Sequence, residues 1–462
     1  MKLLAVTLLS ASIVGSAQTA RVTDTPVNSV PFLGLGIEFD PYPEPVNDAR
    51  WQTMLGRVRR ADTGFLRVMS SATDYCGGFD SAGNPIYLWK SEPEAPALQR
   101  IYDVLDFAQK NGIEVLLGEW SSPGKLGIRS PDDPRWPRMV ADFVQHLIRD
   151  KHYTVIQFYI MMNEPNGDWM WRRSKPQFDQ WSAGVQLLRK ELDARNLQSV
   201  LLAGPDNSGG REWFNRSIAE LHPVYGAWEQ HIYAKDSEVL NGELEQQLFA
   251  DGTTITTLDP EGGAKARFIA ESGLVTGKIE ELDQQPRVHD FDYGVLMADY
   301  VIQVARAGWL GADAWDLDDA MHGNGKGGQK IWGFWDSRSL ETMHPRPWFE
   351  SWSLMSRAMR RGSTVMRVTG DLPASVRATA VKFQSDWSVV IVNDSAAPVS
   401  LDFLMPQGIS HWYAYRYFEN DRKTDVDGFI QNSGTLRTSN GIARIQMPGR
   451  GLLILTNKKL GR

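Results

Sequence analysis

The chain has 462 residues and a formal net charge of −7, with 49 lysines and arginines against 56 aspartates and glutamates. This length predicts one large domain and a smaller one, and the mild acidity argues against nucleic acid as a partner. The single cysteine, Cys76, excludes an intramolecular disulfide, and we expect it to be a small buried residue. The eight histidines form no HExxH motif and no Cys/His cluster, so we expect no metal site and no cofactor.

The N-terminal residues have the pattern of an export signal. Lys2 supplies a positive start, residues 3–14 are apolar, and small residues follow at 15–17. We expect residues 1–17 to be removed by cleavage after Ala17, with Ala20 as the alternative, which predicts a periplasmic or extracellular protein. No other long apolar run lacks charges, so we expect no membrane span. The sequence does not indicate the oligomeric state.

Between residues 30 and 360, short apolar segments typical of strands alternate with amphipathic segments of helical period. The strands are expected near 32–39, 64–69, 113–120, 155–162, 199–203, 228–233, 266–270 and 312–317. The helices are expected near 48–60, from about 98 to a stop at Asn111-Gly112, near 136–152, 177–196 and 212–221, within 237–263, and near 293–308 and 348–359. Eight such alternations predict an α/β fold, a (β/α)₈ (TIM) barrel.

Residues 361–462 have a different pattern, with a period of two from about Ser363. Val399, Leu401 and Phe403 alternate with polar residues, and further strands are expected at 387–392, 412–417 and 451–456. Turn sequences such as Asp-Gly separate these segments. The pattern predicts a C-terminal all-β sandwich domain packed on the barrel.

The segment 155–167, VIQFYIMMNEPNG, places a carboxylate at a strand end. Pro165 cannot donate a hydrogen bond to a strand ladder, and the Asn-Gly pair after it favours a turn. Asn163 and Glu164 are therefore expected at the carboxyl end of a buried parallel strand, where catalytic side chains of barrels lie. A carboxylate beside an amide that could hold a sugar hydroxyl suits cleavage of a glycosidic bond. Alternatively, Glu164 caps a turn.

A second glutamate, Glu271, ends the apolar run 267–270 and is followed by small residues. It lies 107 residues after Glu164, a distance that three βα units of about 35 residues cover, so both side chains are expected on the same rim. Retaining glycosidases use two carboxylates about 5–5.5 Å apart, one as acid/base and one as nucleophile. The alternative is that Glu271 caps the next helix.

These motifs resemble clan A of the retaining glycoside hydrolases, in which Asn-Glu-Pro ends strand four and a glutamate ends strand seven. Within the clan, three segments are similar to glycoside hydrolase family 30. They are 66–71 in strand two, 119–123 after strand three, and 355–363 at the crossing from the last helix into the sandwich. Families 39 and 5, which share the barrel and the catalytic pair, are the alternatives.

The resemblance implies that Glu164 is the acid/base and Glu271 the nucleophile. Proximity to an ionised Glu271 should raise the pKa of Glu164, because two close carboxylates resist double ionisation. Arg67, at the end of strand two, could hydrogen-bond to Glu271 and keep it charged. The alternative for Arg67 is a surface arginine.

Five further residues are candidates for substrate binding. Tyr233 and His231 share one face of strand six by alternation, with the tyrosine hydroxyl near the nucleophile, although either could be a core residue. Asn163 would bind the sugar 2-hydroxyl. Trp315 and Trp120 would be stacking platforms for sugar rings, unless they are ordinary core tryptophans.

The function expected from these features is a secreted retaining β-glycosidase that hydrolyses β-linked oligo- or polysaccharides by double displacement. The alternatives are a transglycosidase and a non-hydrolytic carbohydrate-binding protein on the same scaffold, because fold alone does not separate them. The sequence does not indicate the sugar, the linkage, or whether cleavage is exo or endo.

Overall fold

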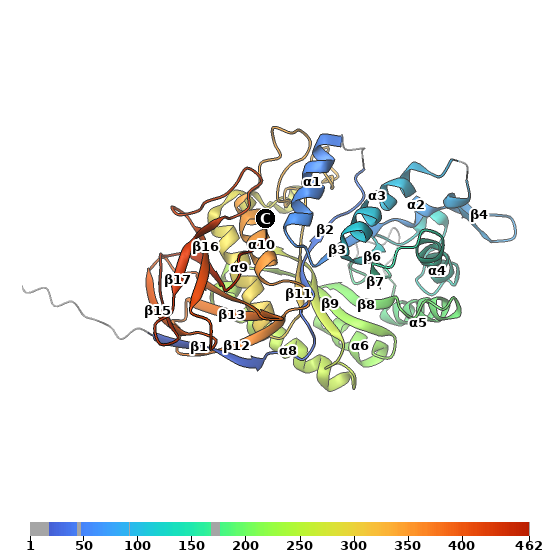
Figure 1. Cartoon of the computed structure of the whole chain (residues 1–462). Coiled ribbons are helices and arrows are strands. Elements are labelled where there is room, and N and C mark those ends of the chain that lie inside the picture. Colours follow the sequence, from blue (N-terminus) through green and yellow to red (C-terminus); the bar gives the residue numbers. More distant parts are fainter. Residues whose placement is uncertain (1–17, 44–47, 92, 168–175, 462) are drawn as a thin grey trace, which may run out of the picture.

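The computed structural model describes residues 18–43, 48–91, 93–167 and 176–461, so the expected export signal at 1–17 lies outside the described residues. The described residues form a barrel and a β-domain beside it (Figure 1). Within these ranges, every helix is too short or too polar to cross a membrane.

The barrel is closed by eight parallel strands, as the alternation predicts. In the order in which they pair, the strands are β2 (Gly34–Glu38), β3 (Phe65–Ser70), β6 (Glu114–Glu119), β7 (Ile156–Ile160), β8 (Leu201–Ser208), β9 (Tyr225–Ala234), β10 (Ala266–Leu274) and β11 (Gly311–Ala314). Aromatic side chains such as Phe65, Phe158 and Phe268 fill the barrel interior. The interior is therefore a packed core, and the polar site is confined to one rim.

Helices surround this barrel. They are α1 (Asp48–Arg60), α3 (Pro96–Asn111), α4 (Arg135–Gln145), α5 (Phe178–Ala194), α6 (Arg211–Leu221), α7 (Asp236–Leu240), α8 (Glu243–Leu258), α9 (Phe291–Arg306) and α10 (Pro347–Ala358). Helix α3 shows why the boundaries could be predicted: Pro96 stands in its first turn, and Gly112, with φ of 65°, ends it. The expected helix at 136–152 is interrupted, because α4 passes into a π-helical turn, His146–Asp150.

The segment between the second barrel strand and α3 contains regular structure. It holds the short helix α2 (Ala72–Tyr75) and a hairpin of β4 (Cys76–Phe79) and β5 (Pro85–Tyr87). Cys76 is buried, as expected. Short 3₁₀ turns complete the barrel loops at Leu88–Lys90, Gly124–Leu126, Glu280–Leu282 and Pro286–His289.

The β-domain contains nine strands and draws on both ends of the chain. They are β1 (Gln18–Pro26), β12 (Thr364–Gly370), β13 (Val376–Phe383), β14 (Asp386–Asn393), β15 (Val399–Leu404), β16 (His411–Phe418), β17 (Asn432–Arg437), β18 (Ile442–Met447) and β19 (Gly451–Thr456). Strand β1 pairs with β12 and β15. Part of this domain therefore precedes the barrel, outside the expected range 361–462.

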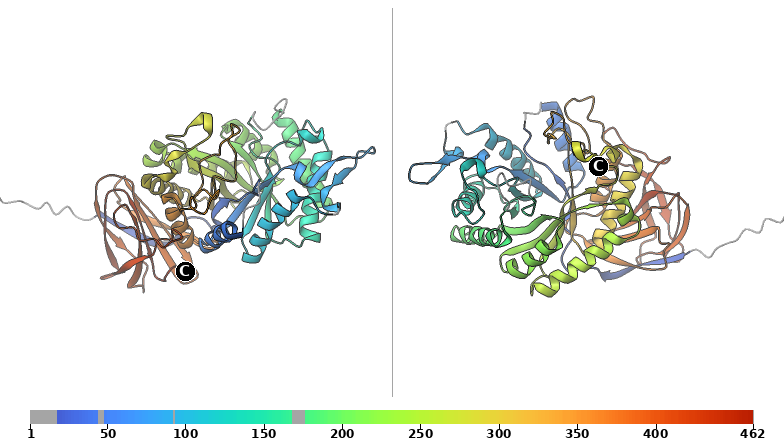
Figure 2. Two further views of the ribbon diagram at one scale, coloured as in Figure 1. Left: turned by 90° about the horizontal axis from the view of Figure 1, so that it is seen from above. Right: turned by 180° about the vertical axis from the view of Figure 1, so that it is seen from behind.

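The side chains of β14 alternate between two hydrophobic cores, and this explains how the two domains pack together. Val389 and Ile391 of β14 face a core shared with Phe403 and Trp412, where strands from both ends of the sheet meet as a sandwich. The intervening Val390 and Val392 face the core of the barrel and its helices. Figure 2 shows the β-domain against one side of the barrel, and α9 and α10 contact it there. Because both faces of β14 are buried, its four consecutive residues 389–392 are all apolar.

Candidate active site

A cavity of about 890 Å³ opens at the carboxyl ends of the barrel strands. Six of the eight residues expected at the site line it, namely Trp120, Asn163, Glu164, Tyr233, Glu271 and Trp315. Residues from the loops after β10 and β11 complete the walls, among them Lys278, Asp283, His322, Lys330 and Trp332. We call this cavity the cleft.

The two glutamates meet in the cleft. A carboxylate oxygen of Glu164 and one of Glu271 lie within 4.8 Å of each other. Glu164 follows β7 with a left-handed φ of 43°. Glu271 lies within β10, where pairing with both neighbouring strands shifts register after Ile269. Such an irregularity redirects side chains next to a site, and here it accompanies a carboxylate that lines the cleft.

Arg67 hydrogen-bonds to four side chains of the site. Its Nη1 donates to Glu271 Oε1 (2.8 Å) and to Glu38 Oε2 (2.7 Å). Its Nη2 donates to Asn163 Oδ1 (2.6 Å) and to Asp206 Oδ2 (3.1 Å). The side chain has no exposed surface, which excludes the alternative of a surface arginine. The guanidinium of this β3 residue thereby connects β2, β8, β10 and the segment after β7 at the rim of the barrel.

His231 bridges the acid/base candidate to a buried carboxylate. Its Nδ1 lies 3.0 Å from Glu164 Oε1, and its Nε2 lies 2.9 Å from Asp206 Oδ1. Both ring nitrogens face carboxylate oxygens, an arrangement that favours the charged imidazole, in which each nitrogen carries a proton to donate. Like Arg67, the His231 side chain is fully buried. Of the residues expected at the site, Arg67 and His231 lie behind those that line the cleft.

The pKa shifts at the site follow from this network. Burial lowers the pKa of His231, but the carboxylates of Asp206 and Glu271 outweigh it and raise that pKa well above its usual value. Burial raises the pKa of Glu164, but the hydrogen bond and charge of His231 outweigh burial and lower it. The pKa of Glu271 is raised by burial, against the opposing charges of His231 and Arg67.

One expectation about these pKa values is wrong for the protein without substrate. Proximity to Glu271 was expected to raise the pKa of Glu164, but the Glu164 carboxylate is stabilised by the His231 cation. The proton of this pair rests on the histidine. The sequence-based prediction considered the charge of Glu271 but not that of His231. His231 contacts Glu164 directly and lowers the pKa of its carboxyl group.

Tyr233 and Asn163 present polar groups to the cleft. The Tyr233 hydroxyl donates to Glu271 Oε2 (2.6 Å), so the two oxygens of Glu271 have different donors, Tyr233 and Arg67. Asn163 Oδ1 accepts from Arg67. This fixes the amide orientation and directs its Nδ2 donor elsewhere, and within the described ranges no protein acceptor for that donor is found.

Comparisons with known proteins agree with this geometry. No protein-family model matches the chain, and no curated protein matches it. A family 30 subfamily 8 xylanase from Clostridium acetobutylicum is similar at a TM-score of 0.66 and 12% identity, over 95% of this chain and 99% of that one. The fold is that of the clan A glycoside hydrolases, of the family 30 type.

Other solved structures share this clan A fold. The catalytic domain of a family 30 xylanase from Talaromyces cellulolyticus has a TM-score of 0.65 at 14% identity, over 95% and 99% of the two chains. An α-L-arabinofuranosidase from Thermotoga maritima has a TM-score of 0.66 at 12% identity, over the same shares. Xylanases and an α-L-arabinofuranosidase are thus named among the similar structures, so the fold does not fix the substrate.

The two tryptophans of this clan A cleft differ in accessibility. Trp315, after β11, is 4% exposed and stacks on His322 with ring centroids 4.9 Å apart. Trp120, after β6, is half-buried and meets Trp315 edge to face at 5.7 Å. Its indole N–H donates to Asp40. Trp120 therefore offers more ring surface to a sugar than Trp315, one face of which is covered.

Several site residues escaped the sequence analysis. Asp206 lies in β8, which extends to Ser208, beyond the expected end at residue 203. The Gly-Pro pair before Asp206 resembles the end of a strand, and that hid the carboxylate. Glu38 is the one charged residue in an apolar strand, a signal that could have identified it as a partner for Arg67.

Two groups of side chains have the spacing of a metal site, Glu164 with His231 and Glu271, and Asp206 with Glu229 and His231. Both groups depend on His231. Each of its ring nitrogens already has a carboxylate partner, Glu164 for Nδ1 and Asp206 for Nε2. The groups are thus better described as one hydrogen-bonded network.

Proposed function

We propose that the protein is a retaining glycosidase that hydrolyses β-linked saccharides. The observation that carries this proposal is the approach of the Glu164 and Glu271 carboxylates to within 4.8 Å in an open cleft. A separation of about 5–5.5 Å suits a nucleophile and an acid/base, whereas inverting sites keep their carboxyl groups about 6.5–9.5 Å apart to admit a water.

In the first step, a Glu271 oxygen attacks the anomeric carbon and the bond to the leaving oxygen breaks. Arg67 and Tyr233 each donate to one Glu271 oxygen, which orients the carboxylate and keeps it charged until attack. In the second step, Glu164 takes a proton from a water molecule as the water oxygen bonds to the anomeric carbon. The bond between that carbon and the Glu271 oxygen breaks, and Glu271 is released as a carboxylate.

The proton for the leaving oxygen comes from the pair of His231 and Glu164. In the protein without substrate this proton rests on His231 Nδ1, 3.0 Å from Glu164 Oε1. A sugar that fills the cleft displaces water from Glu164, which is 13% exposed, and makes a charged pair less favourable than a neutral one. The proton then passes to Glu164 and from there to the glycosidic oxygen.

Substrate contacts follow from what the cleft presents. Asn163 Nδ2 donates to the sugar 2-hydroxyl, a contact that strengthens toward the transition state. Trp120 stacks on a sugar ring, with Trp315 as its edge-on neighbour. Transfer to a second sugar remains the alternative outcome, because both reactions use the same glycosyl-enzyme. A purely carbohydrate-binding role would not require two facing carboxylates with separate donors.

Export of the protein is part of the proposal. Cleavage after Ala17 would leave strand β1, Gln18–Pro26, whole. Cleavage after Ala20 would remove residues that pair with both β12 and β15. The first site therefore suits the fold better than the second.

The test is a panel of β- and α-linked aryl glycosides and neutral polysaccharides, assayed with the natural chain and with Glu271→Gln. The isosteric variant keeps one acceptor oxygen, which Arg67 can still use, and its amide nitrogen can donate to the Tyr233 hydroxyl, but it cannot attack. We expect cleavage of at least one β-linked substrate and a loss of at least about 10³-fold in the variant. Saccharide binding without cleavage across the panel would favour the binding protein instead.

A further inference from the structure

A second cavity lies on the opposite side of the barrel from the cleft. It has a volume of about 790 Å³ and lies between α1, the end of α10 and the edges of β13, β14 and β19. A smaller cavity of about 360 Å³ continues it past residues 111–113, which precede β6. Arg59, Asp62 and Arg360 line both. The two together form one groove at the amino ends of the barrel strands.

The groove is strongly cationic. Its lining contains three carboxylates, Asp62, Asp386 and Asp427, and eight cationic side chains, Arg57, Arg59, Arg60, Arg357, Arg360, Arg361, Lys458 and Lys459. We call this set the basic groove. The whole chain carries a net charge of −7, so this excess of positive charge is local. A concave cationic surface concentrates the field and attracts anions.

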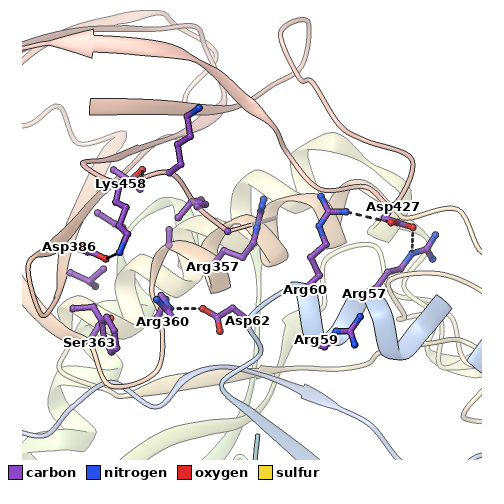
Figure 3. Close-up of a pocket in the computed structure, with 18 of the residues that line it drawn as sticks. Arg57, Arg59, Arg60, Asp62, Arg357, Arg360, Ser363, Asp386, Asp427 and Lys458 are labelled. Atoms are coloured by element: carbon purple, nitrogen blue, oxygen red, sulfur yellow. Dashed lines mark hydrogen bonds and ion pairs between the residues drawn. The ribbon is translucent and has the colours of Figure 1, made fainter. Parts of the chain in front are cut away.

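Carboxylates neutralise part of this charge. Figure 3 shows Arg57 and Arg60 converging on Asp427, Arg360 on Asp62, and Lys458 on Asp386. Two carboxylates beside the groove add to this, because Asp425 pairs with Arg60 and Glu114 with Arg361.

Other cations of the groove have no such partner. Among the described residues, no carboxylate forms an ion pair with Arg59 or Lys459.

Arg357 is the least compensated of these cations. It is buried, it donates to the backbone carbonyls of Ser353 and Ile430, and its guanidinium lies over the Phe429 ring. Burial and then the neighbouring Arg60 lower its pKa to about 10. A buried cation without an anionic partner is costly, and a ligand carboxylate in the groove would offset that cost.

We propose that the basic groove binds an acidic oligosaccharide, in which carboxylates alternate with hydroxyl-bearing positions. Guanidinium groups match carboxylates in bidentate geometry, while Asp62, Asp386 and Asp427 accept hydrogen bonds from sugar hydroxyls. The same three aspartates repel a densely charged chain such as polyphosphate. The choice of a saccharide rests on the proposed function, whereas the choice of an anion rests on the groove alone.

The groove is separate from the cleft and would hold the enzyme on an acidic polysaccharide while the cleft acts on a nearby chain. Its test measures binding of hexagalacturonate by titration calorimetry in the Glu271→Gln protein, at about 50 mM salt, where screening is weak. Removing two exposed cations, in Arg59→Gln/Lys459→Gln, should weaken this binding about tenfold, and high salt should abolish it. Turnover of neutral aryl glycosides should be unchanged by the double variant in the natural background.

The matched control is Arg444→Gln, which removes an exposed arginine of β18 outside the groove and should change the affinity less than twofold. Neutral xylohexaose should show no dependence on Arg59 and Lys459. Equal binding of hexagalacturonate by the double variant and its parent would overturn the proposal. So would binding of inorganic phosphate alone. Neither result depends on hydrolysis, so failure here is distinct from failure of the glycosidase proposal.

Discussion

His231 Nδ1 lies 3.0 Å from Glu164 Oε1, and this contact makes the two side chains one proton-holding unit. Asp206 on the other side of the ring and the nearby Glu271 keep the imidazole charged. The proton needed for leaving-group departure is thus present at the site before substrate arrives. Four predictions follow from the network around this pair.

Removal of the acid, Glu164→Ala, should slow substrates with poor leaving groups by about 10²–10⁴-fold and activated aryl glycosides much less. General acid help matters most when the leaving oxygen is basic. The measurement is kcat/KM across aryl glycosides of graded leaving-group pKa. Equal losses on good and poor leaving groups would contradict the acid role of Glu164.

The variant His231→Asn should shift the pH profile of kcat/KM. In the natural chain, activity falls on the alkaline side when the pair loses its proton, and the raised pKa of His231 places this limb above about 6.5. Asparagine holds no proton, so the limb should move to lower pH, where Glu164 alone deprotonates. His411→Asn in β16 is the control and should leave the profile in place. An alkaline limb at the same pH in the variant would show that His231 does not share the proton that Glu164 donates.

The variant Arg67→Met should destabilise the fold by about 3–5 kcal/mol at pH 7, because Glu38, Glu271 and Asp206 lose a buried cation. Burial raises the pKa of Asp206, but His231 and Arg67 outweigh it and lower that pKa. The resulting stability is present above the unfolded pKa of about 3.9 and is lost at lower pH.

Without Arg67 the buried carboxylates bind protons more readily, so the difference in unfolding free energy should narrow as pH falls from 7 toward about 4.5. Urea unfolding at several pH values measures it. Arg444→Met, which replaces an exposed side chain of β18, should change stability by less than about 0.5 kcal/mol. A loss from Arg67→Met that stays constant with pH would argue against the ionic network as its cause.

The stereochemical outcome should be retention. A Glu164 oxygen and a Glu271 oxygen lie within 4.8 Å of each other, less than the about 6.5–9.5 Å between the carboxyl groups of inverting sites, so we expect Glu271 itself to attack. Two inversions follow, and a β-linked substrate should first release a β-configured product. An NMR time course on fresh reaction mixtures identifies the first anomer. Initial release of the α anomer would show an inverting enzyme.

The sequence was sufficient where the controlling interactions are local. Helix α1 spans Asp48–Arg60 as expected, and α3 ends at Asn111, just before the expected stop at Gly112. Glu164 and Glu271 could be placed on one rim because parallel strands in a barrel present their carboxyl ends together. Each of these features depends on residues a few positions apart, or on a rule that holds for the whole fold class.

The tertiary structure decided everything that depends on distant partners. Strand β1 has too weak a local pattern to predict, and it forms because β12 and β15 supply its hydrogen bonds from more than 300 residues away. The burial of Arg67 and His231 follows from barrel closure, which surrounds them with Glu38, Asp206 and Glu271. The sequence determined which residues could do chemistry. Only the fold decided which of them touch the cleft and where the proton rests, because a pKa is set by the charges that packing brings within a few ångströms.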